Sequence, residues 1–157
     1  YAYVGGNPVN SADPYGLTQC DIDVALEYAT KNLTGKPLPD PDNRRLPKPN
    51  AKWYPPAPVV VSDTIKEHAR SNFRLYDDVY VNTEINKSYL ECLSDAEATD
   101  LFDTIVHEGI HRSMPWGSPL QADPRKTDYV WKATTRMMKG LIPGFLAARE
   151  VCKCCGR

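Results

Sequence analysis

The chain has 157 residues, 41% hydrophobic and 25% charged, a length and composition that suit one globular domain with a single core. Its 19 Lys and Arg residues nearly balance 20 Asp and Glu residues, and this net charge of −1 argues against a nucleic-acid-binding domain, which needs a basic surface. No run of about 18 apolar residues and no signal-like N-terminus is present. We therefore expect that the chain does not insert into a membrane, and that any export uses a route other than a secretory signal peptide.

The first 17 residues combine aromatic residues with Asn-Pro and Asp-Pro dipeptides and lack helical periodicity, which predicts strand and turn structure. Three features of this segment resemble the last segment of the core of rearrangement-hotspot (Rhs) repeat proteins: Tyr1 to Tyr3, Asn7-Pro8, and Asp13-Pro14-Tyr15-Gly16-Leu17. We therefore interpret residues 1–17 as the end of an Rhs core that carries its cleavage motif.

This resemblance implies a toxin. In the Rhs family the repeats build a hollow β-shell around a C-terminal toxin, and the chain is often cut after the leucine of the last motif. Residues 18–157 would then be the toxin domain. Asp13 matches an aspartate thought to act in the cleavage, and Leu17 matches the residue before the cut. The upstream part of the cleavage apparatus is absent, so we expect no self-cleavage here.

The same resemblance implies partners and a place of action. The partners are the Rhs core shell before release and a cognate immunity protein, because a producing bacterium must survive its own toxin. The implied route is delivery into a neighbouring bacterial cell, as in type VI secretion and interbacterial competition. The resemblance leaves open whether the target lies in the recipient's cytoplasm or periplasm.

The first predicted helix begins at Asp21, where apolar residues start to recur at helical spacing, and it continues to Leu33 before Gly35 and Pro37 stop it. Residues 37–58 hold eight of the 14 prolines, a density that neither a helix nor a central strand tolerates. This Pro-rich segment predicts an extended loop that wraps over the domain surface as a spacer, in preference to a segment that recognises a partner.

Two short strands and one helix are predicted next. The run Val59 to Val61 predicts a strand, and residues 63–72 predict a helix capped by Ser62 or Asp63. The alternation of polar and apolar residues from Asp78 to Asn82 predicts a second strand with one buried face.

Three further helices complete the predicted outline. The longest begins at Ser94 or Asp95, has Glu97 in its first turn, and ends at about Met114. The apolar positions of this longest helix are Leu101, Phe102, Ile105, Val106 and Ile110. The other two helices are predicted at residues 127–139 and 144–152, with Gly140 and Pro143 between them. The expected fold class is α+β, rich in helices and with a small sheet.

Five cysteines allow one or two disulfides and leave at least one thiol over. The cluster formed by Cys152, Cys154 and Cys155 lacks the paired spacing of a zinc site, so we assign it no function. The other two cysteines are Cys20 and Cys92. The cysteine content is compatible with an oxidising compartment but does not establish one.

The longest predicted helix contains His107-Glu108-Gly109-Ile110-His111, an H-E-x-x-H motif that uses two of the three histidines. Residues four apart lie one turn apart on the same helix face, so both imidazoles can converge on one metal ion. Glu108 can then reach a water on that metal as the catalytic base. Asp103, one turn earlier, is a candidate to orient a ligand histidine.

The motif resembles that of the zincin metallopeptidases, in which a carboxylate from a following loop or helix often completes the zinc site. Three protein ligands and an open position are what a catalytic zinc needs. Our choice for the third ligand is Asp128, at the start of the next helix, with Asp123 and Glu150 as alternatives. His68 is expected on a surface helix, outside the site.

The expected function is that of a secreted antibacterial toxin acting as a zinc-dependent metallopeptidase on a protein or peptide substrate. One alternative is a metal-dependent nuclease or amidase that uses the same histidines, although Arg44, Arg45, Lys48 and Lys52 form only a weak basic patch. The other is a non-enzymatic effector in which the motif is coincidental.

Overall fold

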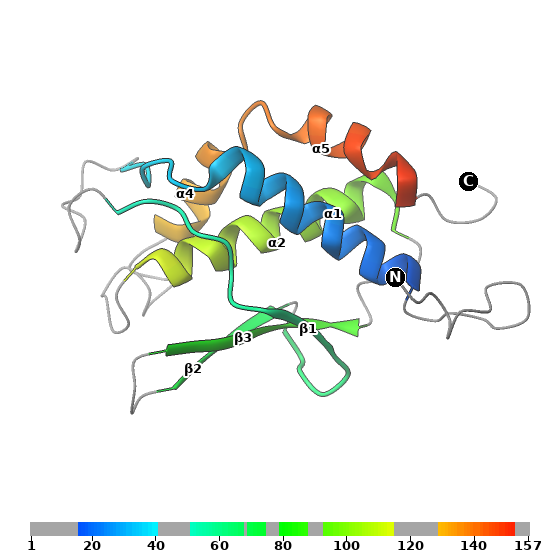
Figure 1. Cartoon of the computed structure of the whole chain (residues 1–157), viewed down its shortest axis with the longest axis horizontal. Coiled ribbons are helices and arrows are strands. Elements are labelled where there is room, and N and C mark those ends of the chain that lie inside the picture. Colours follow the sequence, from blue (N-terminus) through cyan, green and yellow to red (C-terminus); the bar gives the residue numbers. More distant parts are fainter. Residues whose placement is uncertain are drawn as a thin grey trace, which may run out of the picture.

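The computed structural model describes residues 16–40, 51–67, 69–74, 79–87, 93–114 and 129–152. This part of the chain forms an α+β fold, as predicted, with several helices and a small sheet (Figure 1). The elements are α1 (Gly16–Leu33), β1 (Val59–Ser62), β2 (Ala69–Arg74), β3 (Val79–Asn86), α2 (Asp95–Ser113), α4 (Tyr129–Met138), α5 (Ile142–Ala148) and a 3-10 turn, η3 (Arg149–Cys152).

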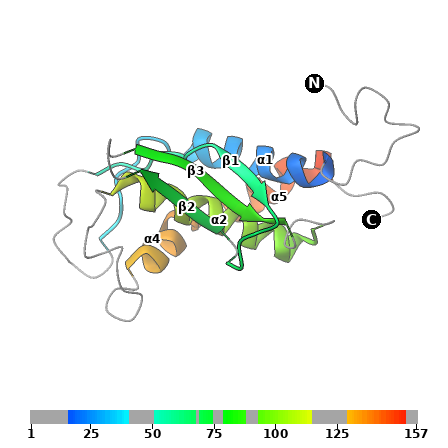
Figure 2. The same cartoon turned by 90° about the horizontal axis from the view of Figure 1, so that it is seen from below.

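The sheet is mixed and has the order β1-β3-β2, with β1 parallel and β2 antiparallel to the central strand β3. It lies on one side of α1 and α2, while α5 lies on the other side of these helices (Figure 1). Figure 2 shows the same arrangement from below, with the sheet crossing in front of the helices. Helix α2 is therefore central, since it packs against α1, α4, α5 and β2.

The core is built around the apolar face of α2. Its predicted apolar residues are all buried, and Phe102 stacks on Phe145 of α5 with ring centroids 4.5 Å apart. Ile22 and Leu33 of α1 belong to the same cluster. Burying each such large side chain contributes about 1.5–3 kcal/mol, so this face of α2 holds the helical layer together and leaves the opposite face for polar groups.

Helix α1 begins at Gly16, about five residues before the predicted start. Gly16 and Leu17 are thus helical and do not belong to a strand-and-turn segment, and the Leu17–Thr18 bond lies in the first helical turn. No helix-breaking residue separates Gly16 from Asp21, so nothing stops the helix from extending. It ends as predicted at Gly35, whose φ of +80° favours glycine. Residues 1–15, with Asp13, lie outside the described residues.

The helix predicted for residues 63–72 is wrong, because residues 69–74 form strand β2. The strand is stabilised by antiparallel pairing with β3, a partner distant in sequence. Side chains add to this pairing, since Asn72 Nδ2 donates to Asn82 Oδ1 at 2.6 Å and to Glu84 Oε2 at 2.9 Å. A capping signal near Ser62 could not reveal these contacts, which override local propensity.

The remaining elements follow the sequence closely. The strand at Val59–Ser62 is confirmed, and so is a strand at residues 79–82, although β3 continues to Asn86. Helices α2 and α4 lie where predicted. Helix α5 begins at Ile142, before Pro143, because proline is tolerated in the first turn of a helix, where its missing N–H has no helical partner.

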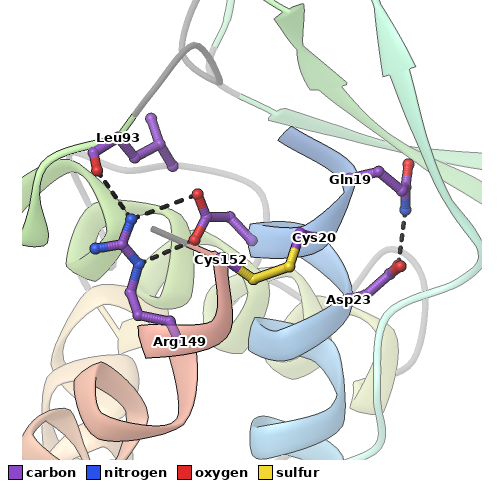
Figure 3. Close-up of a disulfide and its surroundings, with 7 residues drawn as sticks. Gln19, Cys20, Asp23, Leu93, Arg149 and Cys152 are labelled. Atoms are coloured by element: carbon purple, nitrogen blue, oxygen red, sulfur yellow. Dashed lines mark hydrogen bonds and ion pairs between the residues drawn. A yellow bond between two sulfur atoms is a disulfide. The ribbon is translucent and has the colours of Figure 1, made fainter. Parts of the chain in front are cut away.

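Two of the five cysteines form a disulfide that joins the two ends of the described chain. Cys20 of α1 and Cys152 of η3 are bonded across a sequence separation of 132 residues (Figure 3). Cys92, Cys154 and Cys155 lie outside the described residues. The disulfide fixes the last turn of the chain against the first helix.

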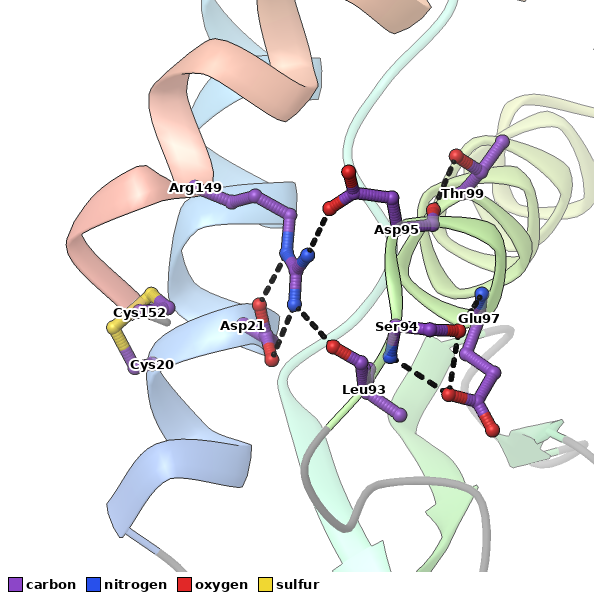
Figure 4. Close-up of polar contacts among 9 residues, drawn as sticks. All are labelled: Cys20, Asp21, Leu93, Ser94, Asp95, Glu97, Thr99, Arg149 and Cys152. Atoms are coloured by element: carbon purple, nitrogen blue, oxygen red, sulfur yellow. Dashed lines mark hydrogen bonds and ion pairs between the residues drawn. A yellow bond between two sulfur atoms is a disulfide. The ribbon is translucent and has the colours of Figure 1, made fainter. Parts of the chain in front are cut away.

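An ionic network lies beside this disulfide and fastens the start of α2 (Figure 4). The guanidinium of Arg149, only 2% exposed, donates to Asp21 at 2.9 Å, to Asp95 at 2.7 Å and to the carbonyl of Leu93 at 2.8 Å. Burial lowers the pKa of Arg149, but hydrogen bonding and charge from Asp21 and Asp95 outweigh this and raise it overall. We call this group the Arg149 network.

Candidate metal site

The H-E-x-x-H motif lies on α2, and the start of this helix is fixed by a capping box. Ser94 Oγ accepts a hydrogen bond from the backbone of Glu97, and the Glu97 carboxylate accepts one from the backbone of Ser94 at 2.7 Å. Such reciprocal capping satisfies backbone donors that the first helical turn leaves free. The register of α2, and hence the direction in which the motif faces, is therefore well defined by its sequence.

The described part of the Pro-rich segment packs against the back of the motif. Trp53 is fully buried, and its indole Nε1 donates to the carbonyl of Val106 at 3.0 Å. Gly109 makes room for this ring, since a Cβ there would lie 2.4 Å from it. Arg112 donates to the carbonyl of Pro55 at 2.7 Å. The described part of this segment thus lies against α2 and places the Trp53 side chain in the core.

His107 and His111 face each other from consecutive turns of α2. Their Nε2 atoms are 3.1 Å apart, and ligand atoms of these two residues and Glu108 all lie within 4.8 Å of one another. Two nitrogens that bind a tetrahedral zinc at about 2.0–2.1 Å are separated by roughly 3.3 Å. The spacing of the imidazoles fits a shared ion, so His107, Glu108 and His111 form a group that could hold a metal.

The environment of His107 keeps its ring neutral. Burial, together with the charge of nearby His111, lowers the pKa of His107 to about 3. Metal ions bind the neutral imidazole, so this state is the one a ligand needs. The ring also packs against Trp131 of α4, with centroids 4.3 Å apart. Its Nδ1 is buried and has no hydrogen-bond partner in the part of the chain that the structure describes.

A cavity of about 370 Å³ opens in front of the motif and is lined by Glu67, Ala69, Thr104, His107, Glu108 and Trp131. Glu108 is only 8% exposed, so its carboxylate is reached from this cavity. The cavity has the size of a small-ligand pocket. It can admit a reacting group beside His107 and Glu108, the two residues of the motif that line it.

Two lining residues, Glu67 and Trp131, were not predicted as site residues. Glu67 precedes strand β2 and pairs with Arg70 at 2.6 Å, so its position depends on the pairing of β2 with β3 and on the packing of β2 against α2. Trp131 lies on α4, which packs against α2. No local sequence signal marks either residue, because both reach the cavity through contacts between distant segments.

The predicted third ligands have different outcomes. Asp128 and Asp123 lie outside the described residues, as does His68. Glu150 belongs to η3, next to Arg149, whose guanidinium binds Asp95 at the start of α2. Asp95 precedes His107 by about 12 residues, or about 18 Å of helix. Glu150 is therefore at the wrong end of α2 to complete the site.

Asp103 lies one turn before His107 on α2, but it does not orient that histidine, because the His107 Nδ1 has no partner among the described residues. Within the described residues, the Asp103 side chain makes no hydrogen bond or ion pair. Burial and the negative charge of Asp100 raise the pKa of Asp103.

No helix in the described ranges is long and apolar enough to cross a membrane. Comparison of the chain with protein-family models, with curated proteins and with solved structures finds no match.

Proposed function

We propose that this chain is a zinc-dependent hydrolase that cleaves peptide bonds. The observation that carries the proposal is the arrangement of His107, Glu108 and His111, whose ligand atoms lie within 4.8 Å of one another beside a cavity. Two imidazoles suit zinc, and an adjacent carboxylate that need not bind the ion is what a hydrolase of this type uses as its base. The motif also resembles that of the zincin metallopeptidases.

In this proposal His107 and His111 hold zinc, and Asp128 supplies the third ligand. Zinc, when bound, provides a Lewis acid that acidifies water and polarises the scissile carbonyl. Glu108 accepts a proton from the attacking water and transfers it to the leaving amine. The carbon–nitrogen bond breaks, and the products are a carboxylate and an amine. The burial of Glu108 keeps its proton exchange with bulk water limited during this transfer.

We further propose that the hydrolase is the toxin domain of an Rhs-type protein. The support is the motif Asp13-Pro14-Tyr15-Gly16-Leu17 with Tyr1 to Tyr3 and Asn7-Pro8 before it. The domain would be enclosed by the Rhs shell, delivered into a neighbouring bacterium and neutralised in the producer by an immunity protein. Its substrate would be a protein or peptide of the recipient cell.

The test is the Glu108→Gln variant of the zinc-loaded chain. We expect zinc content to be unchanged, while peptide hydrolysis falls by about 10²–10⁴-fold, because the amide cannot take up the proton. Glu27→Gln, which changes an exposed carboxylate on α1, is the matched control and should hydrolyse peptides like the wild type. Hydrolysis by Glu108→Gln at the wild-type rate would contradict the mechanism.

Toxicity provides an independent reading of the same variant. Expression of the wild-type chain in bacteria that lack an immunity protein should stop growth, and expression of Glu108→Gln should not. Equal toxicity of the two chains would separate the toxin role from peptide hydrolysis and would refute the peptidase as the cause of killing.

A further inference from the structure

A second, larger cleft runs between α2 and α4 beside the cavity of the motif. It has a volume of about 770 Å³. Thr99, Asp100 and Asp103 line it from α2, and residues of α4 and of the turn that follows line it from the other side. Trp131 lines both spaces and is therefore a wall that they share. The two spaces therefore adjoin at this side chain, with His107 lining the smaller one.

The α2 wall of the cleft carries an unsatisfied negative charge. Asp103 is half-buried and makes no hydrogen bond or ion pair within the described residues, and the charged neighbour that acts on it is another carboxylate, Asp100. Taking a carboxylate out of water without a partner costs free energy. A cation that enters the cleft would remove this cost.

The cations of the chain itself do not fill this role. Lys132, Arg136 and Lys139 line the cleft from α4 and its C-terminal turn, yet none of them pairs with Asp103. All three side chains are exposed, and Lys132 has an interaction of its own. The position beside Asp103 is therefore left for a cation that does not belong to the described chain.

Trp131 adds a second recognition element. Its side chain is 56% exposed, an unusual state for a tryptophan, and it packs against His107 of the motif. An indole face attracts cations and also covers apolar chain. Lysine and arginine combine an aliphatic stem with a terminal charge, so either side chain can lie along Trp131 and end near Asp103.

We propose that this cleft is a subsite for a lysine or arginine side chain of a polypeptide substrate, with Asp103 as the residue that determines this specificity. The inference rests on the proposed peptidase function and names its substrate class. Asp103 precedes His107 by one helical turn, about 5–6 Å along the axis. An extended peptide advances about 3.3 Å per residue, so the basic residue lies within about two residues of the cleaved bond.

The first test measures binding without cleavage. Calorimetry on the zinc-loaded Glu108→Gln variant would compare two alanine-based hexapeptides that differ at one position, lysine against norleucine. We expect the lysine peptide to bind about 10- to 100-fold more tightly, the range of a hydrogen-bonded charge. Asp103→Asn should abolish this preference, and Asp63→Asn, which alters an exposed carboxylate in a loop, should preserve it.

Equal binding of the two peptides, or a preference that survives in Asp103→Asn, would overturn the proposal. Zinc affinity is measured in parallel, because a carboxylate that served the metal site would change it. We expect Asp103→Asn to bind zinc like the wild type. A loss of zinc affinity with no change in peptide preference would assign Asp103 to the metal site and likewise overturn the inference.

The second test maps cleavage by wild-type protein in a peptide library prepared with a Glu-specific protease, so that lysine and arginine remain inside the peptides. Enrichment of these residues at one fixed position near the cut, lost in Asp103→Asn, would support the subsite. Cleavage without enrichment would overturn it. Absence of all cleavage alongside a lysine preference in calorimetry would refute the peptidase function and leave the cation subsite standing.

Discussion

The two ends of α2 bury polar side chains in opposite ways. At its start, Arg149 donates to Asp21, Asp95 and the carbonyl of Leu93, so its guanidinium is satisfied within the protein (Figure 4). Near its end, His107 lines a cavity, and its buried Nδ1 has no hydrogen-bond partner within the described residues. Polar groups that satisfy one another stabilise a fold, whereas a buried polar atom without a partner costs free energy and is typical of residues arranged for function.

The two ends of α2 should respond to the loss of a polar group with changes in stability of opposite sign. Replacing a polar group by an apolar one should destabilise the protein at the start of α2 and should stabilise the metal-free protein at the motif. Binding sites commonly carry such a cost in stability, because their groups are arranged for a ligand and not for the fold. Four substitutions, in order of decreasing effect, test the difference.

Removal of the disulfide should have the largest effect. The double variant Cys20→Ser, Cys152→Ser frees a loop of 132 residues, and we expect the free energy of unfolding to fall by about 4–5 kcal/mol, mainly because the unfolded chain gains entropy. Urea denaturation of the variant, and of reduced wild-type protein, measures this loss. Zinc stoichiometry of the folded variant should not change. A loss below about 1 kcal/mol would show that the disulfide does not hold the start of the fold.

Arg149→Met should destabilise the protein by about 3–4 kcal/mol, because it leaves the carboxylate of Asp21 buried without its partner. Adding Asp21→Asn should recover part of this loss, since the stranded charge is then removed. Equilibrium unfolding of the two variants measures both values. An Arg149→Met protein as stable as the wild type would remove the contrast between the two ends of α2.

Gly109→Ala tests the packing behind the motif, with an expected loss of about 1–3 kcal/mol, because the new Cβ would meet the ring of Trp53 at 2.4 Å. Zinc affinity should fall as well, since the helix must shift to relieve the contact. Thermal unfolding and zinc titration measure the two effects. If Trp53 did not press on this position, alanine would instead stabilise α2 by up to about 1 kcal/mol.

His107→Leu is expected to have the smallest effect on stability and the opposite sign. The metal-free variant should be up to about 1 kcal/mol more stable than the metal-free wild type, because the buried Nδ1, which has no hydrogen-bond partner in the described ranges, is replaced by carbon, although the 3.1 Å contact of Nε2 with His111 is lost as well. Zinc binding should be lost. Urea denaturation in the presence of a chelator gives the comparison. If His107→Leu clearly destabilised the metal-free protein, His107 would contribute to the stability of the fold, and the contrast between the two ends of α2 would be wrong.

The sequence predicted the elements that depend on local signals. A cap at the start of α2, which the structure assigns to Ser94 of the two candidates Ser94 and Asp95, and the position of the motif on α2 are confirmed, because both follow from residues three or four apart. Strand β2 was missed because its stability comes from pairing with a distant strand. Glu67 and Trp131 were missed for the same reason, since helix and sheet contacts bring them to the cavity. The third ligand stays a prediction, as Asp128 lies outside the described residues.

The most direct test of the metal site is the metal content of the purified chain after gel filtration, measured by elemental analysis. The double variant His107→Ala, His111→Ala is measured beside the wild type. We expect about one zinc per wild-type chain and none in the variant, as a site held by two histidines of one helix requires. A folded wild-type chain that stays free of metal after incubation with zinc would contradict the metal site and, with it, the proposed hydrolase.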